Sequence, residues 1–77
     1  MPKRNGAAQQ KTSTLGERVR ERREKLGLTQ EALAGMVGWQ KSAISHVEYG
    51  RMRPGIYKLP DLARALDCTV DFLLTGT

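Results

Sequence analysis

Three glycines separate short segments in which apolar residues recur at helical spacing. They are Gly27, Gly38 and Gly50. Glycine readily adopts the backbone conformation that follows the last turn of a helix, so each of them marks a helix end. The segments between them are too short for long helices, and the chain must therefore fold as a set of short helices packed on one another. We predict helices over residues 15–26, 29–37 and 41–49.

The rest of the sequence continues this pattern. Pro60 suits the first turn of a fourth helix, where its missing N–H has no partner to lose, and Thr69 can cap a fifth helix over residues 70–74. No run of alternating β-branched residues predicts a strand, so the fold class is all-α with five short helices. The side chains expected to face the core are Leu15, Val19, Leu26, Leu33, Ala34, Val37, Ile44, Val47, Leu62, Ala63, Leu66 and Cys68.

The length of 77 residues allows one small domain. Residues 1–14 carry three cations, no acid and no large aliphatic side chain after Met1, so we expect a flexible basic tail there and the folded domain over residues 15–77. No apolar run approaches the roughly 20 residues that span a bilayer, and the N-terminus has no signal-peptide core. We therefore expect a cytoplasmic protein without a membrane partner.

Thirteen Lys and Arg against eight Asp and Glu give a net charge of +5. Such a charge on a small domain indicates a polyanionic partner, nucleic acid first, although a basic surface kept for solubility explains it equally well. One cysteine and one histidine exclude a disulfide and a Cys/His zinc site. There is no phosphate-binding glycine loop, and His46 and Glu48 diverge on one helix, so we expect neither a cofactor nor an enzyme activity.

The second and third predicted helices are joined by about three residues around Gly38, which is the spacing of a helix-turn-helix. The spacing alone fits any corner between two helices. The stretch LGLTQEALAGMVGWQKSAISHVEYGRMRP, however, closely resembles the lambda-repressor-like helix-turn-helix family, also called the Cro/cI or XRE family. The matching residues are Gly27, Leu28, Thr29, Gln30, Leu33, Ala34, Gly38, Ile44, Ser45, Glu48, Gly50 and Pro54. The resemblance extends over residues 15–77, because LPDLARALDCTVDFLLTGT is similar to the last two helices of lambdoid phage repressor domains.

The resemblance implies binding to double-stranded DNA with the third helix in the major groove. With Ile44 and Val47 turned inward, the outward side chains of that helix are expected to contact base edges. These base-reading residues are Lys41, Ser42, Ser45 and His46. The residues expected at phosphates or the minor groove are Gln30, Gln40, Tyr49, Arg51, Arg53 and Lys58. Plain solvated helix surface is the alternative interpretation of this polar face.

Other charged residues receive structural roles from the same resemblance. Arg23 and Glu48 are expected to form a partly buried ion pair between the first helix and the recognition helix. The arginines that alternate with acids on the first helix are expected to be solvated, and they are Arg18, Arg20 and Arg22. Three positions depart from the family pattern, namely Trp39 and Gln40 in the turn and Asp67 after the fourth helix. Trp39 is expected to pack on the turn, with a phosphate contact as the alternative.

The function implied is that of a sequence-specific transcriptional regulator, in the first place a repressor that binds a pseudo-palindromic operator as a homodimer. The apolar side chains near the family's dimer surface are Ile56, Tyr57, Val70 and Phe72, for which ordinary core packing is the alternative. Two further functions retain the same DNA-binding chemistry. One is an antitoxin that also binds a protein toxin, and the other is a restriction–modification controller.

Overall fold

A computed structural model describes residues 13–77 of the chain, so most of the predicted basic tail lies outside the described residues. Within these described residues, five helices follow one another: α2 (Leu15–Lys25), α3 (Gln30–Val37), α4 (Lys41–Glu48), α5 (Leu59–Ala65) and α6 (Val70–Thr75). No strand occurs between residues 13 and 77, and the predicted all-α class is confirmed. Over the same residues, no helix has the length and apolar character that crossing a bilayer requires.

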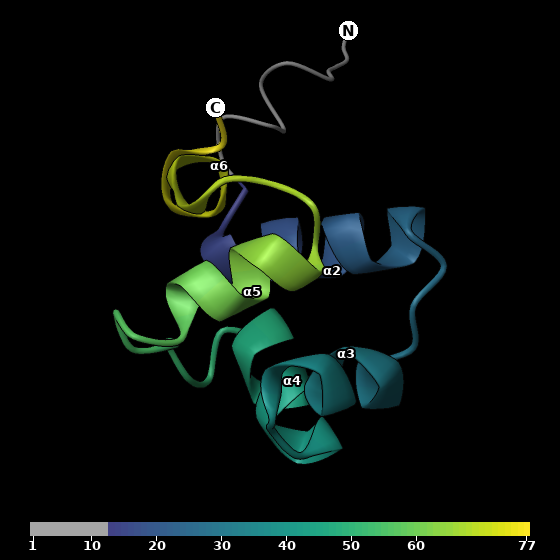
Figure 1. The fold of residues 1–77 in the computed structure, drawn as a ribbon. Coiled ribbons are helices and arrows are strands. Elements are labelled where there is room, and N and C mark those ends of the chain that lie inside the picture. The colour runs from purple at the N-terminus through teal and green to yellow at the C-terminus, as the bar shows by residue number, and fades with distance from the viewer. Residues whose placement is uncertain (1–12) are drawn as a thin grey trace, which may run out of the picture.

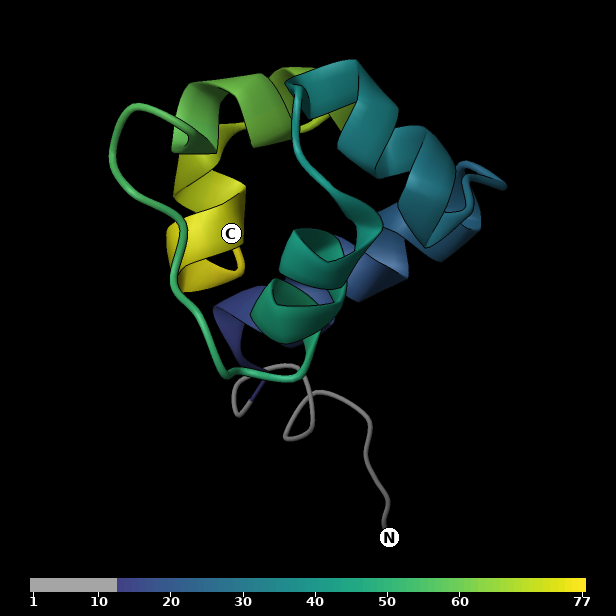
Figure 2. The ribbon, with the colours of Figure 1, turned by 90° about the horizontal axis from the view of Figure 1, so that it is seen from below.

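The helices are arranged along the molecule as two ends with a middle layer between them. Figure 1 shows α3 and α4 at one end of the molecule and α6 at the other, with α2 and α5 between them. The packed pairs are α3 with α4, α2 with α4, α2 with α6, α3 with α5, and α5 with α6. The chain between α4 and α5 runs as a wide loop along the edge of the molecule (Figure 2). The corner between α3 and α4 is therefore exposed at one end of the molecule.

One apolar core holds the five helices together. Its buried members are Val19, Leu33, Ala34, Val37, Ile44, Val47, Leu62, Ala63, Leu66 and Leu73. All of these except Leu73 were predicted from the helical spacing. Leu26 is a wrong prediction: it is 41% exposed, because α2 ends at Lys25 and Leu26 is already the cap residue. Leu15 and Cys68 are only partly buried against the core.

Threonine side chains begin three of the helices. Thr14 accepts a hydrogen bond from the Glu17 backbone N–H, and the Glu17 carboxylate accepts one from the Thr14 backbone N–H in return. This reciprocal capping box satisfies two N–H groups at the start of α2. Thr29 and Thr69 cap α3 and α6 with a single hydrogen bond each, which the hydroxyl oxygen accepts from the Ala32 N–H and the Phe72 N–H. Thr14 was assigned to the tail, yet it is bonded to the folded domain.

Gly16 permits the closest approach between α2 and α4. A β-carbon built at this position would meet the Val47 carbonyl oxygen at clashing distance and would lie 2.7 Å from the Glu48 carbonyl oxygen. Both contacts are to backbone atoms, which no side-chain rotation can move. The packing of α2 on the recognition helix therefore requires glycine at this position, which the spacing of apolar residues did not reveal.

Asp67 occupies the left-handed conformation that ends α5, with φ of 55°. The next backbone N–H, of Cys68, donates to the Ala63 carbonyl at 2.9 Å, which is the hydrogen bond that closes a helix with this geometry. Glycine would adopt the same φ at little cost, whereas a residue with a β-carbon is strained there. Aspartate at position 67, in place of the glycine common in the family, thus keeps the geometry of the turn, but its backbone is strained.

Arg18 and Arg22 are not solvated, and the prediction for them is wrong. Arg18 is only 7% exposed. Its Nε donates to the Leu73 carbonyl at 2.9 Å and its Nη2 to the Leu74 carbonyl at 3.0 Å. Arg22 donates from both Nε and Nη2 to the Leu66 carbonyl. The two guanidinium groups therefore satisfy carbonyls at the C-terminal ends of α6 and α5, where the helix dipole favours a cation.

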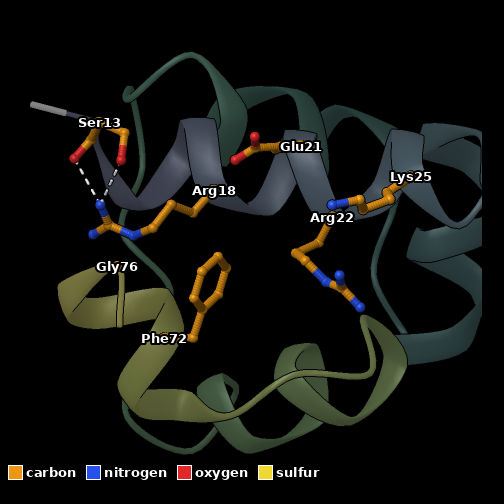
Figure 3. A pocket seen from close by; sticks show the side chains of 7 residues that line it. All are labelled: Ser13, Arg18, Glu21, Arg22, Lys25, Phe72 and Gly76. Atoms are coloured by element: carbon orange, nitrogen blue, oxygen red, sulfur yellow. Dashed lines mark hydrogen bonds between the residues drawn. The ribbon is translucent and has the colours of Figure 1, made fainter. Parts of the chain in front are cut away.

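These arginines flank a cleft of about 260 Å³ between α2 and α6. Figure 3 shows the Phe72 ring between the two side chains, with Ser13 bonded to Arg18 at one end of the cleft. Because Arg18 donates to carbonyls of α6 and Arg22 to the Leu66 carbonyl at the end of α5, the two side chains at this cleft attach α6 and the end of α5 to α2. Arg20 differs, since its side chain is exposed, as predicted, and it pairs with Glu24.

Candidate nucleic-acid interface

The corner between α3 and α4 has the backbone of a helix-turn-helix. Gly38 follows α3 in the left-handed conformation, with φ of 75°. The next backbone N–H, of Trp39, donates to the Ala34 carbonyl at 2.8 Å. Ala34 is buried under this crossing, where its small side chain lets the two helices approach. Trp39 is partly buried, and its side chain packs against the core.

The two sides of α4 differ sharply in burial. Ile44, Val47 and Glu48 are buried and fix the helix to the rest of the domain. The opposite side is exposed at Lys41, Ser42, His46 and Tyr49, and Ser45 is half-buried beside them. Positions three and four apart lie on one face of a helix, so the four predicted base-reading residues come together on one polar face.

A buried ion pair connects this helix to α2. Arg23 Nε lies 2.6 Å from Glu48 Oε2, and Arg23 Nη2 donates to Glu48 Oε1 at 3.2 Å. The Glu48 side chain is only 3% exposed. The remaining terminal nitrogen of Arg23, Nη1, donates to the Leu28 carbonyl at 2.8 Å. The predicted pair is thus present in the structure, with bidentate geometry and an additional backbone partner.

The same carboxylate also binds Gln30, at the start of α3. Gln30 Nε2 donates to Glu48 Oε1 at 3.0 Å. The first helix of the corner, the recognition helix and α2 therefore meet at a single side chain. The hydrogen bond that Arg23 donates to the Glu48 carboxylate raises the pKa of Arg23 above its already high ordinary value, which keeps the guanidinium charged. This three-residue network of Arg23, Glu48 and Gln30 holds the orientation of α4.

The first turns of α3 and α4 are capped differently. The Thr29 hydroxyl accepts a hydrogen bond from the Ala32 N–H at the start of α3. Gln40, in the equivalent position before α4, makes no side-chain hydrogen bond to the helix. The backbone N–H groups at the start of α4 therefore lack a side-chain cap and keep the positive end of the helix dipole accessible.

The loop after α4 carries exposed cations. Arg51 and Arg53 are exposed, and the Arg51 guanidinium lies 5.9 Å from the centre of the Tyr49 ring. Lys58, at the end of the loop, differs from them. Its Nζ donates to the Val37 carbonyl at 2.8 Å. Only two of the three loop cations therefore extend into solvent.

The apolar residues predicted for a dimer surface fall into two groups. Ile56 and Tyr57 are 75% and 92% exposed in the loop between α4 and α5. Val70 and Phe72 of α6 are partly buried against the core. Of these four residues, Ile56 and Tyr57 are thus the exposed pair, and they lie close in sequence to the loop cations.

Comparisons with known proteins agree with this geometry. Repressor protein C2 of Salmonella phage P22 is 45% identical over 65 residues, which cover 84% of this chain and 30% of that protein. A crystal structure of the P22 c2 repressor in complex with a synthetic operator superposes with a TM-score of 0.83 at 44% identity, covering 86% of this chain and 100% of that one. The restriction-modification controller protein C.AhdI from Aeromonas hydrophila superposes with a TM-score of 0.74 at 37% identity, covering 78% and 91%.

The chain spans under a third of the length of the P22 repressor that it matches. A family model described as helix-turn-helix matches residues 19–73, from the middle of α2 into α6. The match covers most of the chain and includes the α3–α4 corner, the buried ion pair and the exposed face of α4. By sequence and by fold, this chain belongs to the lambda-repressor-like branch of the helix-turn-helix family.

Proposed function

We propose that this chain regulates transcription by binding a specific double-stranded DNA sequence, with α4 in the major groove. The observation that carries the proposal is the exposed polar face of α4, which is fixed from behind by a buried ion pair. The similar P22 c2 repressor is in complex with a synthetic operator in its crystal structure. Binding DNA, with no chemical step, accounts for every polar residue brought together at this corner.

The base-reading residues are Lys41, Ser42, Ser45 and His46. The Lys41 ammonium can donate to the O6 and N7 atoms of guanine, and the serine hydroxyls can donate or accept. A neutral His46 ring has one donor and one acceptor nitrogen, so it can match either adenine or guanine. Their common face on α4 allows them to reach consecutive base pairs from one docking position.

The exposed cations of the loop position the protein on the DNA backbone. Arg51 and Arg53 contact phosphates or the minor groove, and Tyr49 lies between them and the base-reading face. Gln40 contacts phosphate at the uncapped start of α4. Gln30 gives one amide N–H to Glu48 and keeps a second N–H for a phosphate. Such contacts supply affinity and orientation but select no sequence.

The chain binds as a homodimer on a pseudo-palindromic site in this proposal. One recognition helix of eight residues reads few base pairs, and a two-fold related pair doubles the site. Ile56 and Tyr57 form the apolar part of the contact, because both are exposed in the loop between α4 and α5. Tyr57→Asp is expected to weaken dimers on DNA while the monomer stays folded, and sedimentation of both proteins with DNA measures this. A wild-type chain that binds as a lone monomer would rule out the dimer.

Repression is the regulatory outcome that the relatives favour, since the P22 relative is itself named a repressor. It requires only that the bound protein occupy promoter DNA. An antitoxin or a restriction–modification controller would use the same α4 chemistry with another partner or target. We propose a cytoplasmic repressor in preference to both.

Selection of bound sequences from a random DNA pool tests the function most simply. We expect enrichment of one motif with two inverted halves. We also expect the affinity for that motif to fall by roughly 10³–10⁵ between 50 and 200 mM salt, if a dimer neutralises about 6–10 phosphates. A pool that yields no enriched motif would contradict sequence-specific binding.

A further inference from the structure

Lys58 makes three contacts that join separate parts of the corner. Its Nζ donates to the Val37 carbonyl at 2.8 Å, at the C-terminal end of α3. The same atom lies 5.5 Å from the centre of the Trp39 ring, in the turn. It also lies 3.7 Å from Asp61 Oδ2, in the first turn of α5. One ammonium group therefore links α3, the turn and α5.

Each of these contacts stabilises the Lys58 side chain in its observed position. The Val37 carbonyl lies at the negative end of the α3 dipole, which favours a cation. The indole face attracts an ammonium through its quadrupole. The Lys58 side chain is 27% exposed. If Lys58 reached for a phosphate instead, it would give up the Val37 hydrogen bond and both electrostatic contacts.

Besides Lys58, the turn is held by the Trp39 N–H, which donates to the Ala34 carbonyl, and by the packing of Trp39 against the core, but by no side-chain hydrogen bond at the start of α4. Gly38 is in the left-handed conformation, and Gln40 makes no side-chain hydrogen bond to the start of α4. The base-reading face begins directly after this turn, at Lys41. A small displacement of the turn would therefore displace the first base contacts, whereas the later part of α4 is held independently through Glu48.

We propose that Lys58 is a positioning residue for sequence recognition: through the Val37 carbonyl and the Trp39 ring, it fixes the turn and with it Lys41 and Ser42. This inference rests on the proposed DNA-binding function. It replaces the expectation that Lys58 contacts phosphate. The two roles differ in a measurable way, because a phosphate contact changes the salt dependence and a positioning residue changes the base preference.

The test compares Lys58→Met with Arg53→Ala in the full chain. Methionine keeps the long unbranched stem and removes the ammonium. The affinity for the selected DNA site and for its single-base variants is measured at several salt concentrations. We expect Lys58→Met to leave the salt slope unchanged and to lower discrimination roughly fivefold or more at the base pairs read by Lys41 and Ser42. Arg53→Ala should lower the salt slope by about one per lost contact and keep the preference.

Two further readouts separate positioning from simple destabilisation. Trp39 is the only tryptophan in the chain, so its fluorescence spectrum should change when the Lys58 ammonium is removed. Lys58→Arg keeps a cation that can donate to the Val37 carbonyl and stack on the indole, and it should restore the base preference. If Lys58→Met does not fold, Trp39→Leu carries the same comparison, with lost discrimination expected at an unchanged salt slope.

The outcomes distinguish this inference from the function on which it rests. A wild-type chain without any preferred DNA sequence would refute the proposed function. A wild-type chain with a preferred sequence, combined with a lower salt slope and an unchanged preference in Lys58→Met, would show a phosphate contact and overturn the positioning role. An unchanged preference in Trp39→Leu would overturn it as well.

Discussion

Removal of the Glu48 carboxylate should be the most damaging single change at the DNA-binding corner. In Glu48→Ala, Arg23 loses its bidentate partner, and Gln30 loses the acceptor of its amide. The guanidinium keeps only the Leu28 carbonyl and a distant Glu24 carboxylate at 3.9 Å. Deprotonation gives no relief, because the ordinary pKa of an arginine lies far above neutral pH even without Glu48.

The structure sets the expected magnitude. The side chains of Arg23 and Glu48 are 12% and 3% exposed, so the pair is buried, and breaking such a pair costs about 3–5 kcal/mol of unfolding free energy. The whole domain is stabilised by only roughly 4–12 kcal/mol at this chain length. We therefore expect the melting temperature to fall by at least roughly 12 °C. DNA affinity should fall with it, because the network fixes the orientation of α4.

Thermal and urea unfolding followed by circular dichroism measure this loss. Glu24→Ala is the matched control, because Glu24 pairs with Arg20 on the exposed side of the same helix. It should cost less than ~1 kcal/mol. Glu48→Gln, which keeps the shape and one acceptor oxygen, should fall between the two. If Glu48→Ala lost no more stability than Glu24→Ala, the buried pair would not hold the recognition helix.

Three further predictions concern the scaffold. Gly16→Ala should destabilise the fold by about 1–3 kcal/mol, because the new β-carbon meets backbone carbonyls of α4. Gly35→Ala, where the β-carbon enters open space, should stabilise the fold by ~1 kcal/mol through helix propensity. Urea unfolding of both variants measures the difference, and equal shifts of the two midpoints would refute the close approach at Gly16. Asp67→Gly should raise the free energy of unfolding by about 0.5–1 kcal/mol, because it relieves the left-handed strain at φ 55°. The urea midpoint should rise accordingly, and a lower midpoint would show that the aspartate is not strained. Burial raises the pKa of the Cys68 thiol, so its alkylation should reach half of its maximal rate at a higher pH in the native chain than in urea. Because the folded chain favours the protonated thiol, the thiol's contribution to the free energy of unfolding should be fully present at neutral pH and be lost as the pH rises from the ordinary thiol pKa through the raised one. Coincident alkylation midpoints would contradict the raised pKa.

Local patterns predicted the helices, because they follow rules that act within a few residues. Apolar spacing, threonine caps and glycine ends placed the boundaries of α2, α3, α4 and α6 to within about a residue of their observed positions, whereas the fourth helix was predicted from Pro60 without bounds. The polar face of α4 followed from the same spacing, once Ile44 and Val47 were assigned to the core. The Arg23–Glu48 pair required the family resemblance, since nothing local connects two residues on different helices.

Several side chains make contacts across the fold that the sequence did not predict. Arg18 and Arg22 alternate with glutamates as solvated residues do, yet they satisfy carbonyls at the ends of α6 and α5. Lys58 belongs to a run of loop cations and differs from them only because the end of α3 lies within its reach. No short-range pattern marks these partners, because they are backbone carbonyls, which every residue possesses.

The central claim is that α4 reads bases while the loop cations contact the DNA backbone. It is tested most directly by one comparison of binding profiles. The affinity for the selected site and all its single-base variants is measured for the wild type, Lys41→Ala, His46→Ala and Arg53→Ala. We predict that Lys41→Ala and His46→Ala change which base pair is preferred, with about 1–3 kcal/mol of discrimination lost per contact, and that Arg53→Ala weakens all sequences equally. Unchanged profiles for Lys41→Ala and His46→Ala, with a changed profile for Arg53→Ala, would contradict this orientation of the recognition helix.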